Sequence, residues 1–281
     1  MDKSSHSEVE KFVMCERSHY YTYGLKIQGK SVSDALVIGN VGHVVLAKYY
    51  LLRQLGSTHE EAVREAFPLI RQEIAYYQPF DEEKMATDMI RILNNYWLHL
   101  AKYDDWEILH VEEAYDIQLT DDFTMPVKID LVCRIPGHGI VALDHKFSRN
   151  FFDVDKLDLS PQLPKYWAAL DALKIRVDEL WYNELRTWTT KDNTADPIQR
   201  FRRTPVIMTP KKVVTIMREQ IMAAKRISQL KQLPIEEWES KVLRNGLACN
   251  MCSFTTLCSA DLEGRDSDLV RESFYEERTY R

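Results

Sequence analysis

The chain has little glycine and proline, with 9 and 10 residues of these types among 281. So low a content argues against a loop-rich all-β architecture. Basic charge is also lacking, because the formal net charge is −6. Proteins that coat nucleic acids regardless of sequence usually carry a basic surface. The negative net charge therefore argues against a coating protein. It argues less strongly against an enzyme, which needs only a local basic groove.

Targeting and motor motifs are absent as well. The polar start of the chain, MDKSSH, lacks the apolar stretch of a signal peptide, and no run of apolar residues approaches the length of a membrane span. The sequence also lacks G-x-x-x-x-G-K-[ST], the loop of nucleotide-driven motors. We expect a soluble, intracellular protein with no membrane partner and no motor of its own.

The hydrophobic residues, 45% of the chain, suffice for one sizeable core. Helical periodicity dominates the first hundred residues, and β-branched runs bounded by turn residues begin after Trp106. This order predicts an α/β fold with a mixed central β-sheet flanked by helices. The expected helices cover about 7–23, 34–55, 59–76, 82–103, 161–173 and 211–230, and the expected strands cover 108–119, 127–135, 140–147, 180–185 and 205–208.

A carboxylate and a lysine share one face at the end of an expected strand. Asp144 and Lys146 are two residues apart, so their side chains point to the same side of the sheet. Such a pair suits metal-assisted hydrolysis, in which the carboxylate holds Mg²⁺ or Mn²⁺. By itself, D-x-K also fits an exposed ion pair. Asp130 would strengthen the interpretation, but it falls opposite Asp144 only if Ile135 pairs with Gly139 across a three-residue loop.

Further polar residues lie where they could support this pair. Gln162 and Tyr166 are four residues apart on the following helix and face the same way, which suits contact with a DNA phosphate or with Lys146. His43 lies inside an apolar helix beside Gly39 and Gly42. Each glycine costs about 1 kcal/mol in a helix interior, which suggests a close approach of backbone or a metal site.

Three of the five cysteines are clustered, as Cys249-x-x-Cys252 and then Cys258 after five residues. Thiolates at this spacing suit a tetrahedral zinc or an iron–sulfur cluster, and either requires a fourth ligand. Cys15 is the better candidate, because Cys133 lies on the expected strand of Asp130 and reads as a core residue. The spacing leaves zinc and iron–sulfur open.

Taken in order, these residues resemble the RecB-like branch of the PD-(D/E)XK nuclease superfamily. The similarity is to members with an iron–sulfur cluster, such as the CRISPR-associated four-cysteine exonucleases and the nuclease domain of AddB. It runs from Cys15 to Cys258. The motifs are an early cysteine, G-x-x-x-H, a strand aspartate, D/E-x-K, Q-x-x-x-Y and C-x-x-C-x-x-x-x-x-C.

The resemblance implies a restriction-endonuclease-like core and a role for each matched residue. His43, Asp130, Asp144 and the carbonyl of His145 would be metal ligands, and Lys146 would be the catalytic lysine. Gln162 and Tyr166 would contact DNA and support the site, and Glu112 or Glu113 would add a carboxylate. The four cysteines, Cys15, Cys249, Cys252 and Cys258, would bind a structural [4Fe–4S] cluster.

We therefore predict a single domain over residues 1–260. It would hold a helical insertion at about 32–104, a nuclease core at about 106–232, a cysteine segment at 249–258 joined to Cys15, and a mobile charged tail at 261–281. The predicted activity is Mg²⁺- or Mn²⁺-dependent hydrolysis of DNA, favouring single-stranded or end-bearing substrates. Any processivity would come from a helicase or recombination partner. The sequence is compatible with a monomer or an oligomer. Two alternatives are a non-catalytic binding protein of this fold and a zinc-stapled nucleic-acid-binding module.

Overall fold

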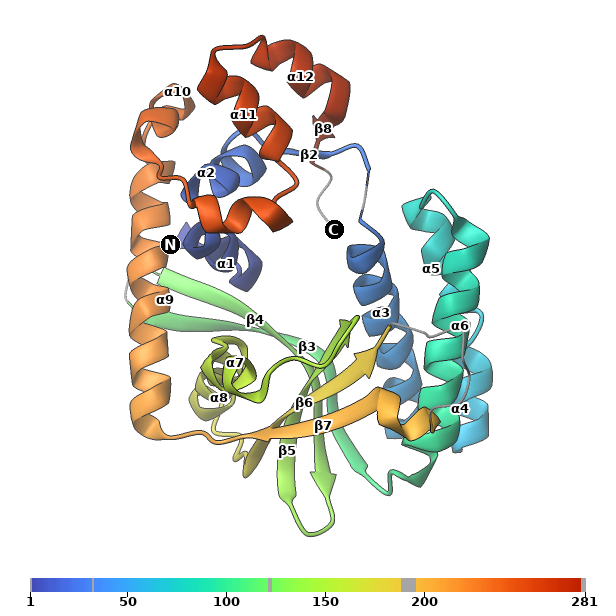
Figure 1. The fold of residues 1–281 in the computed structure, drawn as a ribbon. Helices are drawn as coiled ribbons and strands as arrows, with labels where there is room; N and C mark the ends of the chain where they lie inside the picture. The colour runs from blue at the N-terminus through green and yellow to red at the C-terminus, as the bar shows by residue number, and fades with distance from the viewer. Residues whose placement is uncertain (1, 32, 121–122, 188–195, 279–281) are drawn as a thin grey trace. The chain divides into compact units, whose positions relative to one another are not determined.

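The computed structural model describes residues 2–31, 33–120, 123–187 and 196–278 (Figure 1). The chain forms two compact units. Unit 1 contains residues 1–31, 116–126 and 217–281, and unit 2 contains residues 32–115 and 127–216. The prediction of one domain over 1–260 stays a prediction.

Unit 2 is built on a mixed β-sheet. The strands β4 (Phe123–Ile135) and β5 (Gly139–Ser148) are antiparallel, β5 and β6 (Glu179–Arg186) are parallel, and β6 and β7 (Phe201–Val206) are antiparallel. The long strand β3 (Glu107–Thr120) pairs with β4. The predicted α/β class with a mixed sheet is confirmed.

Helices cover the two faces of this sheet in unit 2 (Figure 1). On one face lie α3 (Asp34–Gln54), α4 (His59–Ala66), α5 (Leu69–Tyr77) and α6 (Glu82–His99), followed by the short helix η2 (Ala101–Tyr103). On the other lie α7 (Val154–Leu159) and α8 (Gln162–Ala172). Alternation along the strands sorts the side chains between these faces. The residues that join the α3–α6 core are Leu131, Cys133, Ile135, Val141, Leu143, Trp181, Leu185 and Phe201.

The helix α3 is apolar because it is a core helix. Its residues Val37, Val41, Val45 and Leu46 have no exposed surface. Among the described residues, α3 is also the one helix whose length and apolar composition would allow it to cross a membrane. The prediction that no run approaches this length was therefore wrong, and burial in the core accounts for the apolar composition.

Unit 1 brings the two ends of the chain together. From the N-terminal end come β1 (Asp2–Lys3), α1 (His6–Met14), α2 (Glu16–His19), the π-helix η1 (Tyr20–Gly24) and β2 (Ile27–Gly29). The strand β2 pairs antiparallel with β8 (Tyr275–Glu277), with Ile27 opposite Glu277. The remaining elements are α9 (Pro210–Lys231, which begins in unit 2), α10 (Ile235–Trp238), η4 (Glu239–Lys241), η5 (Gly246–Met251), α11 (Thr255–Glu263) and α12 (Ser267–Phe274).

Four sequence-based elements need correction. The first helix is interrupted at Cys15, which has extended backbone with φ −166°. The helix expected over 59–76 ends at Ala66 and restarts after Pro68, because proline cannot donate the helical hydrogen bond. The last strand covers 201–206 rather than 205–208. The tail is not mobile up to residue 278, since α12 and β8 occupy it; residues 279–281 lie outside the described part.

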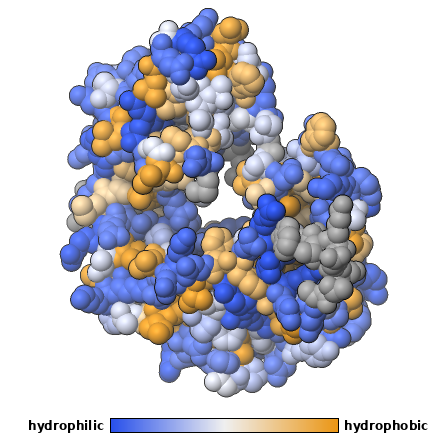
Figure 2. Space-filling model, viewed as in Figure 1, coloured by the Kyte–Doolittle hydropathy of each residue, from blue (hydrophilic) through white to orange (hydrophobic). Residues whose placement is uncertain are grey.

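The surface carries no special hydropathy pattern on the side shown in Figure 2. Apolar residues there are dispersed among hydrophilic ones. Scattered exposed apolar side chains are normal for a folded protein. Hydropathy therefore does not indicate where a functional site lies. The site has to be located from the chemistry of the side chains.

Candidate functional site

The hairpin β4–β5 sets the register on which the candidate site depends. Ile135 pairs with Gly139 and Leu131 pairs with Leu143, so Asp130 falls opposite Asp144. The predicted register is confirmed. It is made possible by Gly137 and Gly139, both with φ of +81°, a conformation that glycine adopts readily.

Asp130 and Asp144 are buried side by side in unit 2. Asp144 is fully buried and Asp130 is 8% exposed. The hydroxyl of Tyr166 lies 3.1 Å from Oδ1 of Asp144 and 3.3 Å from Oδ1 of Asp130, and it can donate its single proton to one of them at a time. Burial, together with the charge of Asp144, raises the pKa of Asp130. Two buried carboxylates held this closely favour a bound cation.

Lys146 closes the other side of Asp144. Its Nζ lies 2.8 Å from Oδ2 of Asp144 and donates a hydrogen bond to Oε1 of Gln162. Nε2 of Gln162 in turn donates to Oδ1 of Asp144. Burial acts to lower the pKa of Lys146, but the charge of Asp144 outweighs it and the pKa is raised. Lys146 therefore stays an ammonium at neutral pH, with its direction fixed by Gln162.

His43 approaches the carboxylates from α3. Its Nδ1 lies 3.3 Å from Oδ2 of Asp130 and 3.7 Å from Oε1 of Glu112. Burial acts to lower the pKa of His43. The charges of Asp130 and Glu112 more than offset this effect, and the pKa is raised to about 9. Without a metal, an imidazolium therefore balances part of the negative charge.

Close packing places α3 at this distance. A Cβ built on Gly42 would lie 2.2 Å from Cζ of Phe147 on β5, whereas one built on Gly39 would meet nothing within 4 Å. The close approach inferred from the two glycines thus holds for Gly42 and not for Gly39.

Glu112, rather than Glu113, reaches the site. Glu112 has φ of +52°, a left-handed conformation that is uncommon outside glycine, and its side chain contacts His43 and Lys128. Glu113 is instead bound to His110 and Tyr115. Lys128 is a member of the site that the sequence analysis missed.

The side chain of His145 is directed away from the site. Burial lowers its pKa well below the ordinary value, and the ring stacks on Tyr50 at a centroid distance of 5.6 Å and lies 2.9 Å from Nδ2 of Asn183. Its backbone N–H donates to Oδ2 of Asp130 at 2.8 Å. The imidazole is therefore no candidate ligand, and only the backbone of His145 belongs to the site.

The residues present fit a divalent cation. Ligand atoms of His43, Glu112 and Asp130 lie within 4.8 Å of one another. Oδ2 of Asp144 is buried and has no hydrogen-bond partner in the described chain, although Lys146 forms its ion pair. Carboxylate oxygens with one imidazole are the donors that Mg²⁺ and Mn²⁺ accept in proteins.

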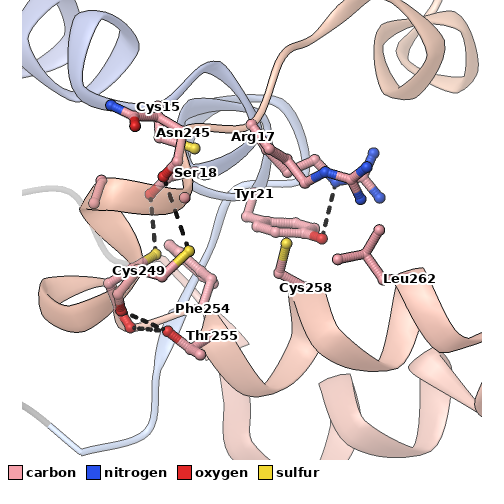
Figure 3. Close-up of a pocket in the computed structure, with 14 residues that line it drawn as sticks. Cys15, Arg17, Ser18, Tyr21, Asn245, Cys249, Phe254, Thr255, Cys258 and Leu262 are labelled. Carbon is pink, nitrogen blue, oxygen red and sulfur yellow. Dashed lines mark hydrogen bonds between the residues drawn. The ribbon is translucent and has the colours of Figure 1, made fainter.

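Unit 1 contains a second candidate site, where four cysteines line one cavity (Figure 3). Cys15 follows α1, Cys249 lies in η5, Cys252 comes directly after η5, and Cys258 lies in α11. The cavity measures about 320 Å³. Cys133 is fully buried in unit 2, which confirms that it is a core residue.

A partly buried ionic network lies beside the cysteines and was not found from the sequence. Arg17 binds Oε1 of Glu239 at 2.6 Å and Oδ2 of Asp261 at 3.0 Å, and its Nε donates to the hydroxyl of Tyr21 at 3.0 Å. Tyr21 also donates to Asp261. In Figure 3, Arg17 and Tyr21 lie next to Cys258. The network ties the beginning of the chain to its end within unit 1.

Comparison with known proteins supports the nuclease interpretation. Residues 3–259 match the model of the PD-(D/E)XK nuclease superfamily. No curated protein matches the chain. A solved structure of a candidate exonuclease from Eubacterium rectale covers 88% of this chain and 86% of its own, with a TM-score of 0.52 and 12% identity, and it shows the same fold.

A second solved structure, of a protein designated SSO0001, covers 90% of this chain and 96% of its own at 14% identity. Its TM-score of 0.32 is too low to carry an argument. The family model, by contrast, spans the hairpin carboxylates, Lys146, Gln162 and Tyr166 in one match. This chain belongs to the PD-(D/E)XK nuclease superfamily.

Proposed function

We propose that this nuclease hydrolyses DNA with one or two Mg²⁺ or Mn²⁺ ions held by His43, Asp130, Asp144 and the backbone of His145. The supporting observation is the buried Asp130–Asp144 pair with Lys146 Nζ at 2.8 Å from Asp144. A bound metal would polarise a phosphate oxygen and lower the pKa of water. Glu112, from the same cluster, would add a third carboxylate.

The side chains divide the remaining work. Lys146, kept charged by Asp144, can orient the attacking water and stabilise charge that develops on the phosphate. Gln162 holds both Lys146 and Asp144, so it fixes their relative direction. Burial raises the pKa of Tyr166 well above its usual value, so this hydroxyl stays protonated and orients the carboxylates. Asp130, Asp144 and Lys146 would be the catalytic residues, and Gln162 and Tyr166 would position them.

The proposed substrate is DNA with a single-stranded region or a free end. The candidate exonuclease from Eubacterium rectale shares the fold, and this likeness favours an exonuclease. A helicase or recombination protein would be the partner that supplies unwound strands.

We further propose that the four cysteines hold a structural [4Fe–4S] cluster rather than zinc. Four ligands at a tetrahedral zinc with Zn–S of about 2.3 Å would lie about 3.8 Å apart. In the described chain, no three cysteine sulfurs lie within 4.8 Å of one another. The cavity of about 320 Å³ that the four cysteines line would accommodate a polynuclear cluster.

The deciding experiment is cleavage of end-labelled single-stranded and circular DNA by anaerobically purified protein, in Mn²⁺ and in EDTA. Metal-dependent loss of linear DNA with circles spared would support the exonuclease. Asp171→Asn, at an exposed carboxylate of α8, is the matched control for Asp144→Asn and should cut like the parent. No cleavage by folded, brown protein would favour the non-catalytic binding protein, and folded but colourless protein would favour zinc.

A further inference from the structure

The loop that follows strand β5 is fixed to the neighbouring strands by hydrogen bonds of its backbone. It covers residues 149–153 and joins β5 to α7. The backbone of Phe152 is bound at both ends, because its N–H donates to Oε1 of Glu184 at 2.9 Å and its carbonyl accepts from Arg202. Earlier in the loop, Ser148 donates to the carbonyl of Asn150 at 2.6 Å.

Glu184 is the centre of this arrangement. It is fully buried, and its carboxylate accepts from Arg202 Nε at 2.7 Å, Arg202 Nη2 at 2.9 Å and Thr204 Oγ1 at 3.0 Å, in addition to Phe152. Burying a carboxylate is costly unless it is paired and hydrogen-bonded, so the site is built around this residue. The carboxylate thereby fixes the position of the Phe152 backbone.

The loop presents aromatic and basic groups. Two guanidinium groups lie over the ring of Phe151, that of Arg202 at 4.7 Å and that of Arg186 at 5.3 Å from its centroid. Phe152 is 42% exposed, and Arg149, three residues earlier in the same loop, is exposed too. Asp153, the last residue of the loop, caps α7 by accepting from the N–H of Asp155. Exposed single phenylalanines are common, and Phe152 differs from them in that both its backbone N–H and its carbonyl are bound.

The strand register places this loop beside the catalytic lysine. Lys146 on β5 pairs with Glu184 on β6, which pairs with Arg202 on β7. Paired residues of neighbouring strands lie about 4.8 Å apart and share one face. Glu184 is thus the strand neighbour of Lys146, and its carboxylate binds the backbone of Phe152. Phe152 is therefore linked to Lys146 through this one residue. This is the neighbourhood that a nucleotide next to the scissile phosphate would occupy.

We propose that Phe152, carried by the Glu184–Arg202 clamp, is a stacking platform for the base next to the scissile phosphate of a single strand, with Arg149 beside the backbone. This subsite rests on the proposed nuclease function. Aromatic rings beside cationic side chains bind single strands because every base has a stacking face and every linkage a negative charge. Base pairing and base stacking within a duplex would occupy that face, so the subsite selects unpaired ends.

The test is a double-mutant cycle between the ring and the base. Binding of a fluorescent single-stranded oligonucleotide is measured with full-length Asp144→Asn protein in EDTA, with and without Phe152→Ala. A single abasic residue is then moved through every position of the oligonucleotide. Phe152→Ala should weaken binding about 5- to 30-fold, and one abasic position should weaken binding to the Phe152 protein by a similar factor.

Coupling is the decisive result. At that abasic position, Phe152→Ala should have less than about a twofold further effect, because ring and base are partners in one contact. Phe152→Trp should restore the affinity. Phe80→Ala is the matched control, since Phe80 is a fully exposed phenylalanine of unit 2 at 106% relative exposure, and it should bind like the parent.

Equal effects at every abasic position, or unchanged binding by folded Phe152→Ala, would overturn the subsite. Cleavage by the parent in Mn²⁺ is measured separately. Cleavage without coupling would leave the nuclease standing and remove the platform. Coupling without cleavage would leave the platform as a binding site and remove the nuclease.

Discussion

The carboxylate site of unit 2 and the cysteine site of unit 1 are held together in different ways. Asp130 and Asp144 are fixed by hydrogen bonds within the protein, to the backbone of His145, to Gln162 and to Tyr166. Contacts of the cysteine sulfurs are long, with 4.0 Å from Cys15 to the carbonyl of Leu243 and 3.8 Å from Cys252 to Ser18. We therefore expect the first site to be organised before the proposed metal binds, and the second to depend on its proposed cofactor for order.

The comparison predicts opposite consequences of losing a ligand. In unit 2, a ligand variant should lose chemistry and keep its fold. In unit 1, a ligand variant should lose its folded structure, and any loss of activity should follow from that unfolding.

The largest expected effect is that of Asp144→Asn on cleavage. The variant keeps the size of the side chain but removes its charge, which would hold the proposed metal and which raises the pKa of Lys146. We expect cleavage to fall by about 10³-fold or more, with the melting temperature in EDTA close to that of the parent. Mn²⁺ at 100 times its Kd should stabilise the parent by about 2.7 kcal/mol and the variant much less.

Cleavage and thermal unfolding with Mn²⁺ and EDTA measure both quantities. A variant that still cuts like the parent would show that Asp144 is not a metal ligand. A variant that unfolds in EDTA would show that the site is not organised in advance.

The next effect is that of Cys258→Ser, which should remove the cofactor. We expect loss of the broad absorbance at about 400 nm and destabilisation by about 3 kcal/mol or more, because cofactor binding is coupled to folding. Cys133→Ala, at the cysteine of unit 2 that lines no such cavity, is the control and should stay brown. Colour retained by Cys258→Ser together with parental stability would contradict the assignment of this ligand.

The strand hairpin and its carboxylates could be predicted from the sequence because the information is local. Alternation over 127–147 and the loop glycines fix the register, and the register fixes Asp130 opposite Asp144. The roles of the site residues stay predictions. The strand β7 was misplaced because Arg202 and Arg203 look like surface residues, whereas they pair with Glu184 and Asp104. Long-range ion pairs of this kind leave no periodic signal.

The same limit applies to the ends of the chain. The spacing of Cys249, Cys252 and Cys258 is local and was informative. The network of Arg17 with Glu239 and Asp261 spans more than two hundred residues, and no local pattern indicates it. Charge density in the tail suggested mobility, although Tyr275 is buried and β8 pairs with β2.

Metal binding in unit 2 should depend on pH. A folded-state pKa of about 9 for His43 means that its charge stabilises the metal-free protein below the unfolded pKa of about 6.5 and that this stabilisation is lost as pH rises through 9. Burial raises the pKa of Asp130, so its ionisation also costs stability as pH rises. Both groups must lose their protons to bind a metal.

Mn²⁺ affinity should therefore tighten by at least about tenfold per pH unit between pH 6 and 9, because His43 and Asp130 each release a proton over the range in which they are protonated. Calorimetry in buffers of different ionisation enthalpy measures the released protons. His43→Gln should reduce both the slope and the proton count. An affinity independent of pH in the parent would show that His43 is not displaced from its ion pairs by the metal.

The smallest effects are expected at the two glycines of α3, which form a matched pair. Gly42→Ala forces the ring of Phe147 to move, because the added Cβ would lie 2.2 Å from it, and should cost about 1–2 kcal/mol. Gly39→Ala meets nothing within 4 Å and should stabilise the helix by up to about 1 kcal/mol. Denaturant unfolding measures both values. Because His43 follows Gly42 directly, Gly42→Ala should also weaken Mn²⁺ binding, and Gly39→Ala should not. Equal effects of the two substitutions would mean that the distance between α3 and β5 does not set the position of His43.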